Sequence, residues 1–328
     1  MSNKKAFITG ATGFLGCNIL EKLEAAGWET YALIRKTSNT KYLPKSTNLI
    51  VGSLLDYDSL ESGIPQDVDA VFHVAGDTSM WSKLNEQQYQ NNVVGTQNMI
   101  KAAQAKNCGR FIFTSSVAAF GFQPGKLLDE NTPSTAADDW INYNKTKYLA
   151  ECEVLKAVEN GLDAVVLNPC HIVGKYDTTS WAQLLKMAYI NKLPGIPPGI
   201  GMFCYAGDVA DAHLAAYEKG RKGEKYLLGG TEASFLEFLN ILQGILGRKP
   251  YQKATPMWML KLGLTLSKIK SIFSSAEPDL TPEKFHIVTK AIRCDYSKAV
   301  KELDFQTTPI KTMVQESLDW MKKESIIV

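Results

Sequence analysis

The stretch Thr9-Gly10-Ala11-Thr12-Gly13-Phe14-Leu15-Gly16 follows a short apolar run at residues 6–9 and opens a helical pattern at residues 14–26. Gly10 permits a tight bend, Gly13 lets the backbone approach a pyrophosphate, and Gly16 allows the helix to pack closely on the sheet. The N–H groups at the helix start favour phosphate there. The stretch therefore predicts a dinucleotide site, with a tight turn without ligand as the alternative. Its candidate contacts are Gly10, Thr12, Gly13, Phe14, Leu15 and Gly16.

Strand and helix patterns alternate through the first half of the chain. Strands are predicted at residues 6–9, 30–34, 48–51, 70–74, 110–114 and 164–167, and helices at 14–26, 59–63, 86–105 and 140–160. Several strands are continuous apolar runs, which is typical of strands covered on both faces in a parallel sheet. The repeated β-α-β units predict an α/β fold of the Rossmann type, with a doubly wound parallel sheet.

The pattern changes after Pro169. Residues 194–201 form a turn-rich loop, and helical patterns with proline breaks dominate from residue 234. We expect residues 1–170 to form a dinucleotide-binding domain, with residues 205–230 returning to it. Residues 171–204 and 231–328 would form a smaller, mostly helical substrate-binding lobe. That lobe would lie over the carboxyl edge of the sheet, where doubly wound sheets bind their ligands.

The composition excludes several classes of protein. With 36 basic and 34 acidic residues in 328, the formal net charge is +2, which gives no reason to expect nucleic acid or a membrane surface as partner. The six cysteines form no Cys-x-x-Cys pair and do not cluster with the four histidines, so we expect no metal site. The most hydrophobic stretch, 256–273, carries three lysines, as an amphipathic surface helix does. Without a signal-peptide pattern, a cytoplasmic location is expected.

The end of the second predicted strand indicates which dinucleotide binds. NAD-preferring folds usually place Asp or Glu there, on the ribose hydroxyls. Residues 32–36, ALIRK, contain no carboxylate, and a guanidinium suits a 2′-phosphate. Arg35 and Lys36 therefore predict NADP(H) in preference to NAD(H), with Lys41 as a further cation in the loop. The alternative for Lys36 and Lys41 is that they are solvated surface charges.

Tyr143 and Lys147 lie four residues apart in the predicted helix at 140–160. That spacing puts both side chains on one face of a helix. A phenol is a poor acid–base catalyst at neutral pH, and a nearby ammonium stabilises the phenolate and lowers its pKa. Lys147 can also hold a nicotinamide ribose. The spacing by itself is common among solvent-facing side chains, so its meaning depends on the surroundings.

Those surroundings include the hydroxyl residues that follow the strand at 110–114. They are expected at the carboxyl edge of the sheet, facing the nicotinamide position. A serine there can donate a hydrogen bond to a carbonyl oxygen that gains negative charge. Ser116 is our candidate and Ser115 the reserve; whichever is not used is expected to cap the strand end.

Together these motifs resemble the extended short-chain dehydrogenase/reductases, of the NAD-dependent epimerase/dehydratase superfamily, over nearly the whole chain. The resemblance rests on residues 9–16, 71–76, 91–96, 114–116, 143–147 and 167–169. The loop of Arg35 and residues 208–213 and 295–299 are similar to the dihydroflavonol-4-reductase-like branch. The resemblance implies further cofactor contacts at Val74, Ala75, Gly76, Asn91 and Pro169.

Two positions depart from the family's pattern. The family usually reads Gly-Asp-Leu before the second helix, with the Asp on the adenine amino group, whereas this chain has Gly-Ser-Leu at 52–54. The adenine contact would then fall to Leu54 and the Ser53 hydroxyl. After Pro169 come a cysteine and His171, which match no pattern that we can assign. We interpret His171 as a hydrogen-bonded structural residue, with a cofactor or substrate contact as the alternative.

The resemblance implies NADP(H)-dependent reduction of a ketone or aldehyde to an alcohol, or the reverse. Tyr143 would supply the proton, Lys147 would tune Tyr143 and hold the ribose, and Ser116 would polarise the carbonyl. The same superfamily offers a nucleotide-sugar epimerase with bound NAD as the alternative. Residues 115–117, Ser-Ser-Val, stand where dehydratases usually carry Thr-Asp-Glu, which argues against dehydration. A non-catalytic NADP-binding regulator is the third hypothesis.

The expected partner is a small-molecule carbonyl or alcohol, with no nucleic acid and no membrane. Apolar and aromatic side chains expected near the pocket hint at a hydrophobic or aromatic substrate, although for any single one of them core or interdomain packing is the favoured interpretation. They are Met80, Trp81, Phe120, Phe122, Trp140, Trp181, Met202, Phe203 and Tyr205. Apolar positions on the helices at 86–105 and 140–160 leave a monomer and a homodimer open.

Overall fold

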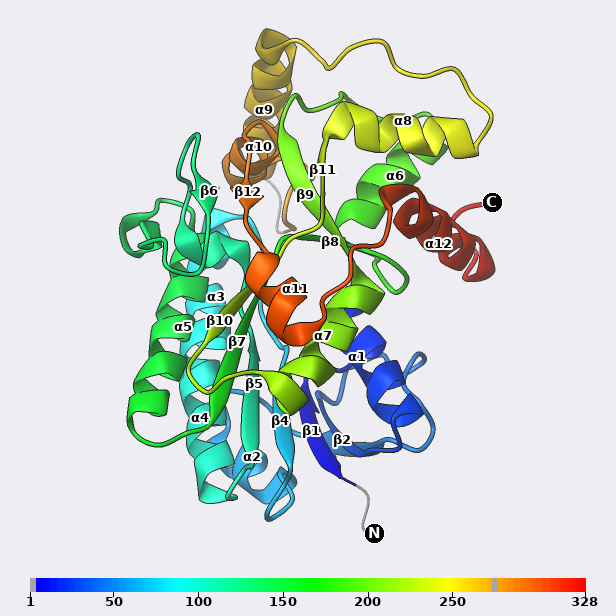
Figure 1. Ribbon diagram of the computed structural model, residues 1–328. Coiled ribbons are helices and arrows are strands. Elements are labelled where there is room, and N and C mark those ends of the chain that lie inside the picture. Colours follow the sequence, from blue (N-terminus) through cyan, green and yellow to red (C-terminus); the bar gives the residue numbers. More distant parts are fainter. Residues whose placement is uncertain (1–3, 273–275) are drawn as a thin grey trace.

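The main sheet confirms the predicted α/β fold. Its strands are β1 (Lys5–Thr9), β2 (Glu29–Ile34), β3 (Asn48–Val51), β4 (Ala70–His73), β5 (Arg110–Thr114), β7 (Ala164–Pro169) and β10 (Lys225–Leu228). In the computed structural model, which describes residues 4–272 and 276–328, these seven strands are parallel and lie in the order β10-β7-β5-β4-β1-β2-β3 (Figure 1). The chain order reverses between β1 and β4, and ligands of doubly wound sheets bind at such a switch point.

Helices cover both faces of this sheet (Figure 1). The side chains of a strand alternate between faces, so Phe7 packs in one buried cluster and its neighbours Ala6 and Ile8 in the other. The cluster of Phe7 takes apolar residues from α2 (Tyr57–Gly63), α4 (Gly95–Ala105) and α5 (Asn142–Glu159). The cluster of Ile8 takes them from α1 (Phe14–Ala25), α7 (Ala206–Lys219) and α11 (Ser297–Leu303). Burial on both faces explains why the strands read as continuous apolar runs.

The later part of the chain contains a small sheet besides the expected helices. Its strands are β8 (His171–Val173), β9 (Ile200–Tyr205) and β11 (Thr231–Ser234), in the order β11-β9-β8. They pack with α6 (Trp181–Tyr189), α8 (Phe235–Ile245) and α12 (Ile310–Lys323) around a separate apolar core. The short strands have no distinct pattern of their own, because β8 starts two residues after β7 ends and β9 emerges directly from the turn-rich loop.

The remaining elements are one long interrupted helix, several short segments and two late helices. The predicted helix at 86–105 is one helical segment made of α3 (Asn85–Tyr89), a π-helical turn (Gln90–Val94) and α4. A 3-10 turn (Val117–Phe120) follows β5, and the two-residue strands β6 (Leu127–Leu128) and β12 (Arg293–Cys294) pair with each other. The helices α9 (Met257–Ile272) and α10 (Pro282–Val288) complete this end of the molecule (Figure 1).

Candidate active site

The glycines of the turn after β1 differ in what requires them. Gly10 has φ +70°, and a Cβ there would lie 2.6 Å from the backbone nitrogen of Ala75. A Cβ on Gly16 would collide with the carbonyl of Gly10. A Cβ on Gly13 would meet only the carbonyl oxygen of Gly10, at 3.2 Å. The fold therefore requires Gly10 and Gly16, whereas Gly13 leaves free space over the turn.

That free space suits a phosphate group. Gly13 is the N-cap of α1, and because it has no side chain, no side-chain oxygen caps the first N–H groups of the helix. The first turn of α1 also carries no acidic residue that would repel an anion. A pyrophosphate fits these uncapped donors. The chain's own residues thus offer a cradle for a dinucleotide next to the switch point.

Two of the three basic side chains after β2 are free to meet a 2′-phosphate. Arg35 and Lys36 are exposed, and neither forms an ion pair with a carboxylate of the described part of the chain. The backbone N–H of Arg35 donates to the Ser38 hydroxyl at 2.9 Å, which fixes the turn. Lys41 instead forms an ion pair with Glu324 near the C-terminus. That pairing makes Lys41 a structural cation.

The segment at residues 52–54, where the sequence departs from the family's pattern, is held by hydrogen bonds. The Ser53 hydroxyl accepts the backbone N–H of Leu55 at 3.2 Å, and the carbonyl of Leu54 accepts the Asn98 side-chain amide at 2.9 Å. The second bond fastens the segment to α4. Leu54 is therefore held in place by the backbone, while the Ser53 hydroxyl is partly occupied by its own turn.

A buried relay of hydrogen bonds joins the ends of β1 and β4, and sequence reasoning did not identify it. Thr96 donates to the carbonyl of Asn92 at 2.6 Å, so its oxygen accepts from Nε2 of His73, at 3.0 Å. The other ring nitrogen, Nδ1, then accepts from the Thr9 hydroxyl at 2.7 Å, and Thr9 accepts the N–H of Ala75 at 3.2 Å. Burial, with the charge of a nearby lysine, lowers the pKa of His73 to about 3. The neutral histidine therefore holds the segment after β4 against the glycine turn.

The paired asparagines of the π-helical turn take different positions. The Asn91 amide donates to the Asp77 carboxylate at 3.1 Å. Asn92 is buried, and its side-chain oxygen accepts the N–H of Asp77 at 2.7 Å. A Cβ on Gly76 would lie 3.7 Å from that oxygen and 3.5 Å from Nζ of Lys147. Asn92, which the sequence reasoning passed over, is thus the asparagine beside Lys147.

Ser116, Tyr143 and Lys147 come together at the carboxyl edge of the sheet. Tyr143 and Lys147 lie on α5, and Nζ of the buried Lys147 donates to the carbonyl of Thr114 at the end of β5, at 2.8 Å. Burial lowers the pKa of Lys147 to about 8. Burial raises the pKa of Tyr143, while a hydrogen bond with Ser116 acts in the opposite direction. The phenol is therefore protonated at neutral pH and lies within hydrogen-bonding reach of Ser116.

The two neighbouring serines have separate tasks. Ser115 is buried, and its hydroxyl donates to the Glu151 carboxylate at 2.8 Å. Ser116 caps the 3-10 turn, where its oxygen accepts the N–H of Ala118 at 3.1 Å. Because that contact uses the Ser116 oxygen as an acceptor, the hydroxyl hydrogen is left for another partner. Of the two candidates, Ser116 is the one that faces Tyr143.

A buried carboxylate lies behind these groups. Besides Ser115, the Glu151 carboxylate accepts from the Asn168 amide at 2.9 Å and pairs with Nζ of Lys225 at 2.9 Å. Glu151 follows Lys147 by one helical turn, and its charge raises the pKa of Lys147 against the larger effect of burial. Glu151 thus connects the segment after β5 with β7 and β10 and helps to keep Lys147 positively charged.

Replacing Glu151 by glutamine is expected to act on both stability and pH dependence. The change leaves Lys225 without its buried partner and costs about 3 kcal/mol in the free energy of unfolding. It also removes the charge that raises the pKa of Lys147, so the ammonium is lost at a lower pH than in the parent. The alkaline limb of the pH–rate profile, where loss of the ammonium lowers the rate, should therefore shift to lower pH. Denaturant titrations and pH–rate profiles test this, with Glu159→Gln, exposed on the same helix, as the control. An unchanged alkaline limb would contradict the role given to Glu151.

The end of β7 places its two candidates differently. Pro169 is buried as the last residue of the strand, at the carboxyl edge. His171 packs its ring against Trp181, Phe203 and Phe235, with ring centroids 4.6, 5.6 and 6.2 Å apart. Burial lowers the pKa of His171 to about 4, so the ring is neutral. His171 belongs to the aromatic packing of the small sheet.

The aromatic pocket candidates range from fully buried core residues to one that is mostly exposed. Phe120 and Phe203 are almost wholly buried. Trp140, however, is 56% exposed and stands just before α5, the helix that carries Tyr143. The ring of His286 meets Phe122 and Trp140 edge to face, with centroids 4.9 and 5.6 Å apart. These three rings form an aromatic group beside the start of α5.

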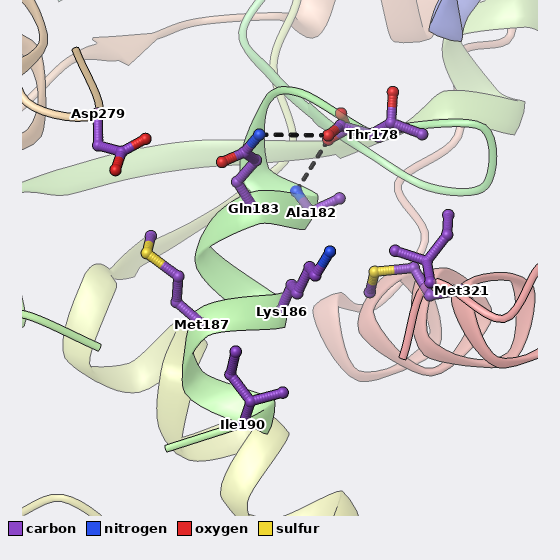
Figure 2. A pocket seen from close by; sticks show the side chains of 10 residues that line it. Thr178, Ala182, Gln183, Lys186, Met187, Ile190, Asp279 and Met321 are labelled. Atoms are coloured by element: carbon purple, nitrogen blue, oxygen red, sulfur yellow. Dashed lines mark hydrogen bonds between the residues drawn. The ribbon is translucent and has the colours of Figure 1, made fainter. Parts of the chain in front are cut away.

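A separate hollow of about 220 Å³ lies between α6 and α12. Figure 2 shows Gln183, Lys186, Met187 and Ile190 along α6, with Met321 of α12 opposite. Its lining includes none of Ser116, Tyr143 and Lys147. The hollow therefore belongs to the packing of the later part of the chain, outside the candidate active site.

Comparison with known proteins identifies the family of the chain and several relatives. Residues 6–229 match the model of the NAD dependent epimerase/dehydratase family. The chain is 30% identical to a Synechocystis sp. protein provisionally named dihydroflavonol 4-reductase, over 98% of this chain and 95% of that one. It is 26% identical to sterol demethylase protein B of Methylococcus capsulatus, over 98% and 99% of the two chains. The chain also superposes on the crystal structure of gox2253 with a TM-score of 0.85, over 99% of this chain and all of that one, and the two sequences are 30% identical.

Proposed function

The chain belongs to the NAD dependent epimerase/dehydratase family, and within it we propose an NADP(H)-dependent oxidoreductase that reduces a ketone or aldehyde to an alcohol. The observation that carries the proposal is the meeting of Ser116, Tyr143 and Lys147 beside the switch point of the sheet. The relative named as a dihydroflavonol 4-reductase supports a reductase. The reaction would run in either direction.

Each of the three side chains has a task that fits its surroundings. When bound, the reduced nicotinamide supplies a hydride to the carbonyl carbon. The Tyr143 hydroxyl gives its proton to the carbonyl oxygen, and the Lys147 ammonium stabilises the phenolate that remains. Ser116 donates its hydroxyl hydrogen to the same oxygen as negative charge develops there. One carbonyl, one hydride and one proton give one alcohol.

Preference for NADP(H) is supported by the surface after β2. The exposed Arg35 guanidinium can form charge-assisted hydrogen bonds to a 2′-phosphate. No carboxylate stands at the strand end to bind the ribose hydroxyls of NAD. The cradle over Gly13 would hold the pyrophosphate, and the segment Val74–Gly76 would border the cofactor on its other side.

Replacing Arg35 by serine tests this preference. Loss of the charge-assisted bonds should lower kcat/KM for NADPH about 10- to 100-fold and leave the value for NADH within about threefold. The matched control is Lys41→Gln, which removes a cation of the same loop that pairs with Glu324 and should leave the NADPH/NADH ratio unchanged. Initial-rate kinetics with both cofactors decide the matter. An unaltered ratio in the Arg35 variant would contradict the assignment.

The aromatic group beside α5 supports a hydrophobic or aromatic substrate. Trp140 is largely exposed three residues before Tyr143, and its ring meets that of His286, which in turn meets Phe122. Flat apolar surfaces of this kind line many specificity pockets. A turnover screen of aromatic, aliphatic and sugar-derived carbonyl compounds, with NADPH and NADH, tests the whole proposal. Loss of NADPH absorbance with carbonyl substrates is expected, and activity with nucleotide sugars alone would overturn it.

A nucleotide-sugar epimerase is the second candidate, favoured by the family to which the chain belongs. An epimerase holds its cofactor through the whole cycle and consumes none. The exposed Arg35, with no acidic residue at the end of β2, disfavours tightly held NAD. A non-catalytic cofactor-binding regulator would have no need to keep Ser116, Tyr143 and Lys147 together.

A further inference from the structure

Helix α9 presents an apolar face to solvent. Trp258, Leu262, Leu266 and Ile269 repeat at a spacing that puts them on one side of the helix, and each is between 54% and 67% exposed. Met259 widens this face and is 47% exposed. Sequence analysis predicts an amphipathic surface helix here, but the apolar side is the one turned outward. An exposed apolar patch of this kind marks an interaction surface.

The opposite side of α9 holds the helix to the protein. The Ser267 hydroxyl donates to the carbonyl of Leu280 at 2.6 Å, and Leu260 lies against Gly195. The outward direction of the apolar face is thus set by contacts on the inner side. Figure 1 shows α9 beside α10, at the end of the molecule away from the N-terminus.

Helix α9 itself carries charge of one sign. Within α9 (Met257–Ile272) the sequence has three lysines, Lys261, Lys268 and Lys270, and no Asp or Glu. Lys261 and Lys268 are exposed and lie seven residues apart, on one flank of the apolar face. The formal net charge of +2 for the whole chain conceals this cluster.

We propose that α9 is a docking surface for a bilayer that contains anionic lipid, with the helix lying in the plane of the interface. Trp258 and the apolar side chains would enter the boundary between headgroups and acyl chains, and the flanking lysines would meet lipid phosphates. A second copy of the chain fits less well, because two facing α9 helices would bring at least four lysines together, with no carboxylate on either helix. None of the described helices is long and apolar enough to cross a bilayer.

The docking surface is linked to the candidate active site. Beyond α9, the Glu277 carboxylate accepts the backbone N–H of Met80 at 3.1 Å. Met80 lies three residues after Asp77, which binds both Asn91 and Asn92. A bilayer under α9 would therefore lie beside a segment that leads to the site, a position suited to an enzyme that takes lipophilic carbonyl compounds. The docking itself does not depend on the proposed reaction.

Vesicle sedimentation with the full chain tests the proposal. The protein should bind vesicles of phosphatidylcholine with about one third phosphatidylglycerol, should bind pure phosphatidylcholine more weakly, and should be released by salt. The double variant Leu262→Gln/Leu266→Gln should bind at least about tenfold more weakly, because two apolar side chains no longer enter the bilayer. Lys261→Gln/Lys268→Gln should lower the affinity for the anionic vesicles by about tenfold or more and leave binding to pure phosphatidylcholine unchanged.

Matched controls separate this effect from general loss of exposed side chains. Val300→Gln changes an exposed apolar residue on α11, and Lys311→Gln/Lys322→Gln removes two exposed cations from α12; neither should change binding. Unaltered thermal unfolding would show that the variants fold. Absence of binding by the parent protein, or equal binding by the leucine variant, would overturn the proposal. So would light scattering that finds a dimer which the leucine variant dissociates. Vesicle binding needs no turnover. A failure of the docking proposal can therefore be distinguished from a failure of the proposed reductase function.

Discussion

Replacing Tyr143 by phenylalanine is expected to lower kcat for carbonyl reduction about 10²- to 10⁴-fold, the range found when a general acid is removed. The variant keeps the buried ring and loses only the hydroxyl that lies within reach of Ser116. The Lys147 ammonium lies on the same face of α5, so in the parent protein it supports the phenolate that forms when Tyr143 gives up its proton. Affinity for NADPH should change by less than about threefold.

The control for this variant lies on the same helix. Tyr148→Phe removes a phenol from α5 that is also partly exposed and that the site does not use. Stopped-flow measurement of NADPH oxidation would separate the chemical step from cofactor binding. Full turnover by Tyr143→Phe, with normal NADPH binding, would remove Tyr143 from the mechanism.

The second large effect is expected when glycines of the turn after β1 are replaced by alanine. One replacement should lower the stability of the fold, and the other should lower the affinity for NADPH. Gly16→Ala places a Cβ against the backbone of Gly10, where no flexible side chain can move aside, so we expect a loss of at least about 3 kcal/mol in stability or no folded protein. Gly13→Ala meets only a carbonyl oxygen at 3.2 Å and should fold normally. The added methyl group would, however, fill the space over the N-terminus of α1, and affinity for NADPH should fall about 100-fold.

These outcomes are measured by thermal unfolding and by calorimetric titration with NADPH. Gly244→Ala is the control, because a Cβ there has no atom within 4 Å and the residue lies within α8, where alanine should stabilise slightly. A Gly13→Ala variant that binds NADPH as the parent does would show that the phosphates lie elsewhere.

The local features of the fold and site could be predicted from the sequence because each depends on neighbouring residues. The strands of the main sheet are apolar runs because both of their faces are covered by helices. The spacing of Tyr143 and Lys147 fixes their common face as soon as a helix is assumed. The turn that contains Gly10 and Gly16 is required by the backbone itself.

Other features depend on contacts that the sequence does not reveal. From the sequence, Lys41 is a candidate cofactor ligand, but in the structure it pairs with Glu324, which lies far along the chain. The π-helical turn shifts the helix phase, so the position of Asn92 beside Lys147 cannot be obtained from a regular helical spacing. The relay through His73 needs β1, β4 and α4 to be assembled first. The outward face of α9 is likewise set by which side the rest of the chain covers.

The transfer of deuterium from NADPH labelled at the nicotinamide C4 position tests the central claim most directly. With a carbonyl compound that the protein reduces, we predict that the label appears on the carbinol carbon of the product, with one NADPH oxidised for each alcohol formed. The same reaction with Tyr143→Phe should be slower by the factor given above. Interconversion of nucleotide-sugar epimers without net consumption of NADPH, and without deuterium transfer to any carbonyl compound, would contradict the account.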